Sequence, residues 1–302
     1  MRKAVIDIGT HSVLFLAVDD KKDKRQILFD ESVSTLLGEG MQKSSLLSES
    51  NISATAAVVK SFYEKAVANG IDNVSLFGTA ALREAKNANG FLRSLGSNLM
   101  EKTKILSGKE EARYTFWANS MFDSRYRNMV VIDMGGGSTE VVYGSRDKII
   151  EIASFDFGAV KLFEKMGSKI ELSVENYLEL EKMMDLRIAD SKLSFPFRDT
   201  CAVLVGGTIT TLVALKEHLE QYDSALIDGY RLNRADLWEI FATINQMDLS
   251  GRNTMPGMEK GRAPYMALGT LMLIVLLKKM DISFFKVSVK GARYGILNGV
   301  NI

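Results

Sequence analysis

Two short stretches of the sequence carry the same set of chemically useful residues. In each, an aspartate ends an apolar run, and glycine and a hydroxyl side chain follow before a second apolar run. At identical offsets, the sets are Asp7, Gly9 and Ser12, and Asp133, Gly135 and Ser138. Glycine lets backbone N–H groups converge on an anion because no Cβ blocks the approach. The repeat therefore predicts two strand–turn–strand units whose turns bind phosphate from the two sides of a cleft.

The aspartate beside each turn would place a negative charge next to a bound phosphate. A carboxylate repels a phosphate group, so Asp133 makes most sense as a ligand of a hard cation, Mg²⁺ by preference, with a phosphate oxygen as another ligand. Ser138 and Thr139 add hydroxyl donors to the second turn. The alternative is a glycine-rich hairpin with a solvated aspartate, and the triple glycine alone does not decide between the two.

Two further segments place a small polar turn at a predicted helix start, where free N–H groups and the helix dipole attract anions. In the first segment, 78–85, Thr79 begins a helix and Arg83 follows one turn later. The second is Gly206-Gly207-Thr208, which follows a predicted strand. Spacing alone favours Arg83 slightly as an ordinary surface cation.

A third helix start, at Ser107, carries the adjacent carboxylates Glu110 and Glu111. Neighbouring side chains point about 100° apart on a helix, so the two cannot both face one site. One of them could act in catalysis while the other is solvated, or both could be first-turn acids that favour the helix dipole.

An α/β chain of two domains must position these residues. The length of 302 residues exceeds what one hydrophobic core usually serves. Each half opens with a three-stranded meander and continues with alternating helices and short strands, and the apolar segment 265–279 predicts a buried helix. The charged run 19–25 is predicted to be a solvated hairpin turn, and His218 to lie in the middle of a helix.

Composition excludes several classes of function. The formal net charge of +1 gives no sign of a nucleic-acid or membrane-surface partner. The longest apolar run, Met266–Leu277, is too short to span a bilayer. The single cysteine, Cys201, allows no disulfide within the chain, and the N-terminus enters a strand without room for a signal peptide, so we expect a cytoplasmic protein. A homodimer is the commonest assembly of soluble enzymes.

Six motifs in order and spacing resemble the exopolyphosphatase / guanosine pentaphosphate phosphohydrolase (Ppx/GppA) family, over residues 4–297. They are Asp7–Ser12, Gly78–Asn87, Ser107–Ala112, Val131–Glu140, Gly206–Thr208 and Gly291–Gly295. The resemblance implies an α/β fold of two actin-like ATPase (ribonuclease H-like) domains of duplicated plan around a central cleft. It implies a first domain of 1–118 plus a C-terminal helix near 291–302 that packs back onto it, and a second domain of 119–290.

The resemblance also assigns roles by position. It makes Glu111 the catalytic general base and Arg83 a phosphate-binding arginine. It makes Asp133 and Glu140 ligands of Mg²⁺ (or Mn²⁺), with Asp7 in the outer shell. The substrate-binding residues that it implies are Thr10, His11, Ser12, Gly136, Gly137, Ser138, Gly206, Gly207 and Thr208.

The implied reaction is hydrolysis of the terminal phosphate of inorganic polyphosphate, of the guanosine pentaphosphate pppGpp, or of both. An actin-fold ATPase or kinase and a sensor that binds polyphosphate or the alarmone without cleaving it are the alternatives. The sequence departs from the family pattern at His11, which suggests a pH-dependent grip on phosphate. It also departs at Pro264 and Tyr294, which are expected to lie away from the chemistry.

Overall fold

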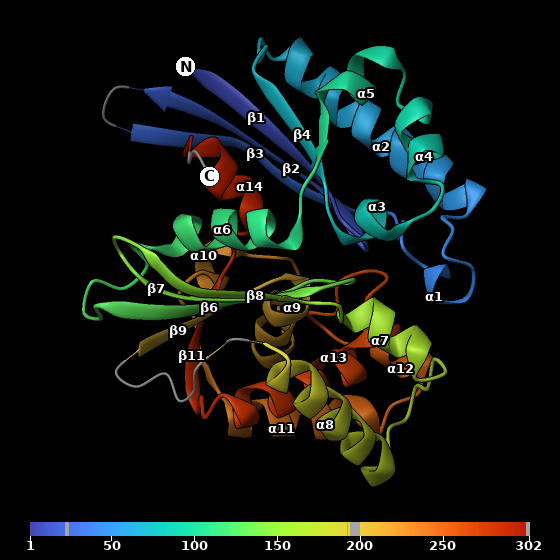
Figure 1. Cartoon of the computed structure of the whole chain (residues 1–302), viewed down its shortest axis with the longest axis vertical. Helices are drawn as coiled ribbons and strands as arrows, with labels where there is room; N and C mark the ends of the chain where they lie inside the picture. Colours follow the sequence, from blue (N-terminus) through green and yellow to red (C-terminus); the bar gives the residue numbers. More distant parts are fainter. Residues whose placement is uncertain (22–23, 192, 194–199, 300–302) are drawn as a thin grey trace.

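The computed structural model describes residues 1–21, 24–191, 193 and 200–299. Two α/β bodies, each built around its own sheet, lie one above the other in Figure 1. None of the helices in this described part of the chain has the length and apolar character that a membrane span requires.

The first sheet begins as an antiparallel meander and continues with parallel strands. Its strands, in chain order, are β1 (Arg2–Ile8), β2 (Ser12–Lys21), β3 (Lys24–Ser34), β4 (Val74–Gly78) and β5 (Thr103–Ile105). Their order across the sheet is β3-β2-β1-β4-β5, with β4 parallel to β1. The helices of this body are α1 (Met41–Ser44), α2 (Glu49–Ala68), α3 (Ala80–Glu84), α4 (Ala88–Ser94) and α5 (Ser97–Lys102). Ser48 caps α2 as its sequence position predicts, since its side chain accepts a hydrogen bond from the Asn51 amide.

The second sheet repeats this plan and adds one strand. Its strands are β6 (Asn128–Met134), β7 (Thr139–Ser145), β8 (Ile149–Phe155), β9 (Thr200–Val205), β10 (Arg231–Asn233) and β11 (Phe284–Ser288). The order β8-β7-β6-β9-β11 matches the first sheet position by position, and β10 extends the far edge. In the paired hairpins Asp7 stands opposite Leu14, and Asp133 opposite Glu140 at the same offset. This confirms the predicted fold class, two actin-like α/β domains of duplicated plan.

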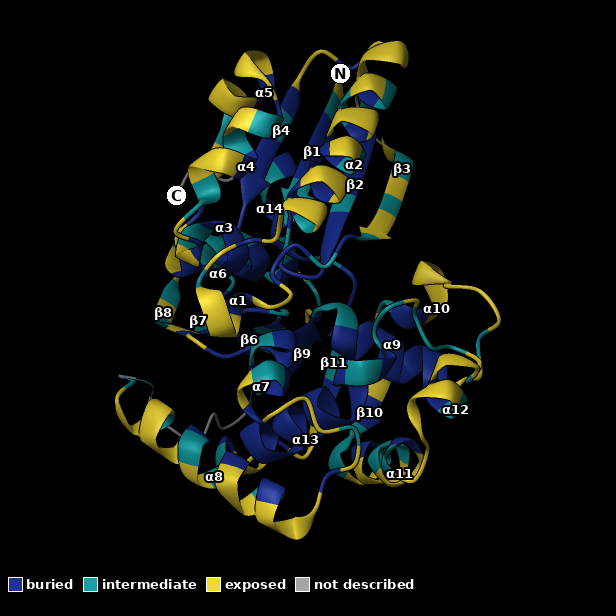
Figure 2. Ribbon diagram, turned by 90° about the vertical axis from the view of Figure 1, so that its right-hand side faces the viewer, coloured by how far each residue is buried: buried dark blue, intermediate teal, exposed yellow. Residues whose placement is uncertain are grey.

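A cluster of helices covers the second sheet. They are α7 (Ala159–Lys165), α8 (Val174–Ala189), α9 (Gly207–Lys216), α10 (Ser224–Ile227), α11 (Arg234–Asn245), α12 (Leu249–Asn253) and α13 (Ala263–Lys279). The predicted buried helix is α13, which is buried on nearly every side in Figure 2 because its apolar residues face both the sheet and the outer helices. Pro264 lies in its first turn, where the missing N–H group has no helical partner to lose.

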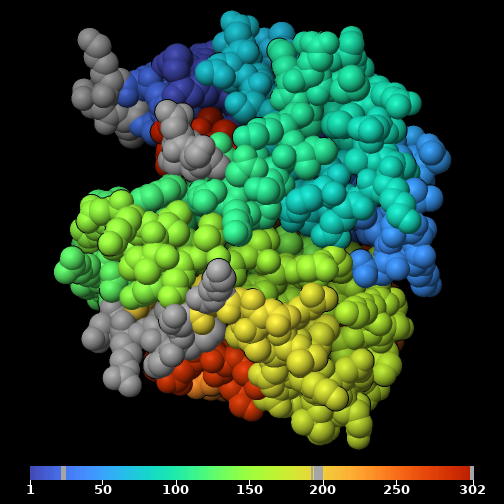
Figure 3. Space-filling view, in the orientation of Figure 1, coloured from blue at the N-terminus to red at the C-terminus, as the bar shows by residue number. Residues whose placement is uncertain are grey.

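Two helices, α6 (Gly108–Asn119) and α14 (Ala292–Leu297), lie between the bodies. Ala112 and Phe116 of α6 pack on the second sheet. The opposite side of α6 meets α14, which packs with Val5 of β1. In Figure 3 the two bodies are in broad contact, and red atoms of the C-terminal segment are visible between them. Because α6 contacts both bodies, the boundary at 118/119 stays a prediction, and residues 300–302 of the predicted first domain lie outside the described residues.

Further contacts join the bodies at the rim near α1. The Glu164 carboxylate of α7 accepts hydrogen bonds from the amides of Gly40 and Gln42, at 2.6 and 3.2 Å. Lys161 of the same helix forms an ion pair with Glu84 at 2.6 Å. These contacts hold the turn-bearing ends of the two sheets together.

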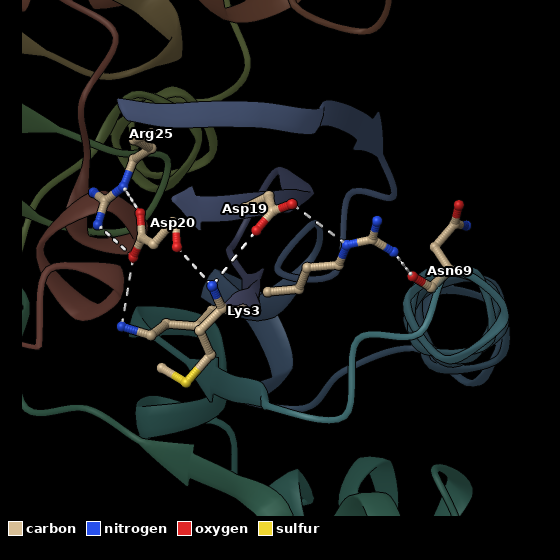
Figure 4. A network of polar contacts seen from close by, with 7 residues as sticks. Lys3, Asp19, Asp20, Arg25 and Asn69 are labelled. Atoms are coloured by element: carbon tan, nitrogen blue, oxygen red, sulfur yellow. Dashed lines mark hydrogen bonds and ion pairs between the residues drawn. The ribbon is translucent and has the colours of Figure 1, made fainter. Parts of the chain in front are cut away.

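Two local predictions were wrong. The charged run 19–25 is not merely a turn, because Asp19 and Asp20 belong to β2 and Arg25 to β3; residues 22 and 23 are outside the described part. Figure 4 shows that these side chains form a network across the sheet end, with Arg25 on Asp20 at 2.6 Å and Lys3 on Asp20 at 3.6 Å. His218 is not mid-helix, since α9 ends at Lys216 and His218 has a φ of 50° in the left-handed region.

Candidate active site

A cavity of about 460 Å³ lies between the two bodies and is lined from both. Most of the predicted site residues line it. From the first body and α6 these are Asp7, Thr10, His11, Ser12 and Glu111; from the second, Asp133, Gly136, Gly137, Ser138, Gly206 and Gly207. Arg83, Glu140 and Thr208 are not part of the lining.

The two turns have the same hydrogen-bonded frame. Gly9 donates to the Ser12 carbonyl at 3.0 Å, and Gly135 donates to the Ser138 carbonyl at 3.0 Å. The carbonyls inside each turn are bound within their own body, for example Thr10 by the Gly38 amide and Gly136 by the Val160 amide.

The amides of these turns are left free. Across the described part of the chain, no hydrogen bond is donated by the amides of Thr10, His11, Gly136 or Gly137. Each turn therefore presents unpaired N–H groups, the arrangement that binds phosphate oxygens.

The turns meet so closely that glycine is required in the second one. A methyl group on Gly137 would stand 2.7 Å from Thr10 Oγ1 and 2.8 Å from Ala80 Cβ. On Gly136 it would stand 3.2 Å from a Val160 methyl and 3.3 Å from Thr10 Cβ. The absence of a side chain at these positions brings the two sets of free amides to one cavity.

The structure separates the two adjacent glutamates. Glu110 closes a capping box at the start of α6, where its carboxylate accepts from Ser107 and pairs with Lys104 at 2.9 Å. Glu111 instead lines the cavity. Its Oε2 lies 3.5 Å from Nη1 of Arg83, a nitrogen that also donates to the Leu106 carbonyl at 2.8 Å. Arg83 thus contacts the predicted base, Glu111, but does not itself line the cavity.

Burial raises the pKa of four carboxyl groups in this region, those of Asp7, Glu111, Asp133 and Glu140. It raises the pKa of Asp7 to about 7 and that of Glu140 to about 8, with nearby Asp133 adding to both. The pKa of Glu111 is raised by burial first and then by the charges of Glu140, Asp133 and Asp7. The pKa of Asp133 is also raised by burial, although Thr115 opposes this by donating to its Oδ2 at 2.9 Å.

This cluster suits a divalent cation. Among the described residues, no group of three or more histidine, cysteine, aspartate or glutamate side chains is arranged to enclose a metal ion alone. Mg²⁺ commonly takes one or two protein carboxylates and completes its shell with water and substrate phosphate. Asp7 and Asp133 line the cavity with such oxygens, while Glu140 lies behind the second turn and accepts from Ser154 at 2.8 Å. A nearby cation would also favour the ionised form of these buried groups.

The surroundings of His11 disfavour protonation of its imidazole. Burial first, and then the charge of Arg262, lower the pKa of its imidazole to about 3. Its ring nitrogens lie 2.9 Å from Ser12 Oγ and 3.2 Å from the Gly261 carbonyl. This lowered pKa opposes the expected pH dependence of phosphate binding through His11, which stays a prediction because a bound phosphate would raise the pKa of the imidazole.

The glycine pair before α9 lines the cavity, but the threonine after it does not. Thr208 is buried and packs beside Gly269 of α13, whereas Thr210 is a lining residue. Gly207 leaves room for the Arg262 guanidinium, which a methyl group there would meet at 1.9 Å.

Sequence reasoning missed several residues of the site. Thr115 gave no signal, because a buried threonine inside an amphipathic helix usually reflects packing. Arg262 and Arg293 both line the cavity, and Arg293 lies inside a motif that was noted without a role. Tyr294 does not line the cavity, in agreement with its expected place away from the chemistry, but its hydroxyl donates to Oδ2 of the lining residue Asp30 at 2.7 Å.

The chain is similar to several known proteins. It is 26% identical to exopolyphosphatase 2 of Mycobacterium tuberculosis, over 92% of this chain and 91% of that protein. It is 28% identical to the bifunctional 3-dehydroquinate synthase/phosphatase of Fusobacterium nucleatum, over 99% of this chain but only 46% of that protein, so it spans about half of that relative.

A solved structure of the Aquifex aeolicus member of the Ppx/GppA family resembles it with a TM-score of 0.82 and 28% identity, over 99% of this chain and 97% of that one. The model of the Ppx/GppA phosphatase family matches residues 17–300, nearly the whole sequence. The chain therefore belongs to the Ppx/GppA phosphatase family.

Proposed function

We propose that the protein is a phosphoric anhydride hydrolase that releases the terminal phosphate of inorganic polyphosphate, of pppGpp, or of both. One observation carries the proposal: Glu111 lines the same cavity as two turns whose amides are unpaired. Phosphate is bound from both sides there, with a carboxylate beside it to activate water. Similarity to a protein named exopolyphosphatase 2 supports the same reaction.

Different residues of the cavity bind the phosphate and activate the attacking water. The amides of the two turns and the Ser12 and Ser138 hydroxyl groups bind the oxygens on which negative charge develops in the transition state. Glu111 accepts a proton from the attacking water, and its raised pKa makes it a stronger base than an exposed glutamate. Arg83 lies 3.5 Å from Glu111, where it holds the carboxylate in place and adds positive charge beside the phosphate.

Asp133 and Asp7, with Glu140 behind them, would hold Mg²⁺ (or Mn²⁺). A bound divalent cation neutralises phosphate charge and orients the leaving group. Without the cation, those of these groups that are ionised repel the substrate, so we expect phosphate binding to the turns to be stronger when the cation is bound.

Steady-state phosphate release tests the proposal most directly. We expect release from polyphosphate or pppGpp in the presence of Mg²⁺, and loss of that release in excess chelator. Turnover of ATP with a phosphoryl acceptor, and none with either of these substrates, would instead favour the kinase alternative. Tight binding of both substrates without release under Mg²⁺ would favour a sensor.

The proposal also includes a cytoplasmic location and a homodimer. Cell fractionation and sedimentation equilibrium test these two points independently of the chemistry.

A further inference from the structure

Arg293 lies at a distinctive point of the cavity. It is the second residue of α14, the helix between the two bodies, and its side chain is only 11% exposed. Arg293 also belongs to the wall of the cavity. A buried cation in this position needs a partner for each of its N–H groups.

The guanidinium is fixed on one side only. Its Nη2 atom donates to Asp30 Oδ1 at 3.2 Å and to the Val289 carbonyl at 3.4 Å. Tyr294 donates to the other oxygen of Asp30 at 2.7 Å, and the guanidinium carbon lies 5.0 Å from the centre of the Tyr294 ring. Asp30 and Tyr294 therefore hold the plane of Arg293 from β3 and α14.

Two of the three guanidinium nitrogens have no hydrogen-bond partner among the described residues. Nε is buried and has no hydrogen-bond partner, and Nη1 makes no hydrogen bond with any residue that the structure describes. Leaving a buried charged donor unpaired is costly unless a ligand completes it. Arg293 lines the same cavity as Asp7 and Asp133, so its guanidinium belongs to the wall where phosphate is proposed to bind.

We propose that Arg293 is a substrate-binding residue whose Nη1 atom donates to a phosphate oxygen, and that Asp30 and Tyr294 are positioning residues which hold it for that contact. The proposal rests on the proposed function and adds a cation to the site from the C-terminal helix. Because Asp30 fixes Nη2, the planar guanidinium holds Nη1 in one direction, which the flexible lysine side chain cannot reproduce.

Tyr294 has a specific part in this arrangement. Its hydroxyl donates a hydrogen bond to Asp30 without adding a charge, so Asp30 stays fully negative and can pair with Arg293. An acidic side chain at this position would instead repel Asp30. The tyrosine therefore keeps the ion pair between β3 and α14 intact beside the cavity.

The test compares Arg293→Lys, Tyr294→Phe and the double variant. Arg293→Lys retains the charge but loses the planar guanidinium with its Nη1 donor. If the role of Arg293 is limited to neutralising Asp7 and Asp133, the variant should stay close to wild type. We expect its KM to rise by about tenfold to a hundredfold, the range for losing a hydrogen bond to a charged group, while kcat changes by less than about threefold. Tyr294→Phe raises KM less, and adds little when Arg293 is already lysine. Arg125→Lys, at an exposed arginine remote from the cavity lining, is the matched control.

Three outcomes overturn the proposal: an unchanged KM in Arg293→Lys, a fall in kcat alone, or an undiminished effect of Tyr294→Phe in the double variant. Thermal melting identifies a variant that has lost its fold. Calorimetric binding of inorganic tripolyphosphate with Mg²⁺ gives a second readout. If the wild type binds tripolyphosphate but hydrolyses nothing, the proposed function fails while weaker binding by Arg293→Lys still supports this inference; equal binding by the two proteins refutes it.

Discussion

Replacing Gly137 with alanine tests whether the close approach of the two turns is required. The added methyl group would lie 2.7 Å from Thr10 Oγ1 and 2.8 Å from Ala80 Cβ. Neither atom is the end of a long flexible side chain, so the clash is relieved only if the turns move apart. Overpacking of this kind costs about 1–3 kcal/mol. Since about 1.4 kcal/mol corresponds to a factor of ten, the closed arrangement should be weakened by roughly 5- to 150-fold.

The assay is kcat/KM for phosphate release, with two graded controls. Gly136→Ala should lose less activity, because its nearest contacts, at 3.2 and 3.3 Å, can adjust by a few tenths of an ångström. Gly90→Ala, in α4, has no heavy atom within 4 Å of the new methyl group and should keep full activity. Alanine should also stabilise that helix by about 0.5–1 kcal/mol. A Gly137→Ala enzyme within about twofold of wild type, or one that is more active than Gly136→Ala, would refute the reasoning.

Three further predictions concern pH, metal and the core. Because the pKa of His11 is lowered to about 3, its contribution to stability is full above its unfolded pKa near 6.5 and is lost as the pH falls from there towards 3. Between pH 7 and pH 5, His11→Asn should therefore lose less unfolding free energy than wild type. Urea titrations at the two pH values measure this difference. The pKa values of Asp7 and Glu140 are raised, to about 7 and 8, so their effect on stability has the opposite pH dependence: it is full below their unfolded pKa values and is lost as the pH rises through 8. Mg²⁺ should therefore raise the melting temperature more at pH 8 than at pH 5.5. A larger gain at the lower pH would count against metal binding by these residues. Arg252 is fully buried and donates to the carbonyls of Ile244, Met247 and Ile170. Arg252→Ala removes a charged donor from these three carbonyls, at about 1–3 kcal/mol each, so it should lower the unfolding free energy by at least about 3 kcal/mol without changing KM. A loss below about 1 kcal/mol would show that water replaces those donors.

Much of the fold could be predicted from the repeated local sequence pattern. Asp7 and Asp133 end strands because apolar runs lead into them and glycine follows, and both properties are readable within a few residues. The choice between Glu110 and Glu111 was also partly encoded locally, since serine followed three residues later by glutamate is the signature of a capping box. That signature assigns Glu110 to the helix start and leaves Glu111 for the cavity.

Features that depend on tertiary contacts were not predictable. Arg293 and Asp30 are far apart in the sequence, and only the return of α14 to the first sheet brings them within 3.2 Å. Thr208 was misplaced for a similar reason, because the packing of α9 on α13 turns its side chain away from the cavity and presents Thr210 instead. His11 looked like a pH sensor by residue type, whereas its environment suppresses protonation.

The central claim is that Glu111 activates water for attack on a phosphate held by the two turns. Glu111→Gln keeps the size and most hydrogen bonds of the side chain but removes its basicity, and Glu110→Gln is the matched control one residue away. We predict that Glu111→Gln lowers kcat by about 10²- to 10⁴-fold, with binding of tripolyphosphate nearly unchanged, and that Glu110→Gln keeps kcat within a few fold. A kcat for Glu111→Gln close to that of wild type, or an equal loss in both variants, would contradict the account.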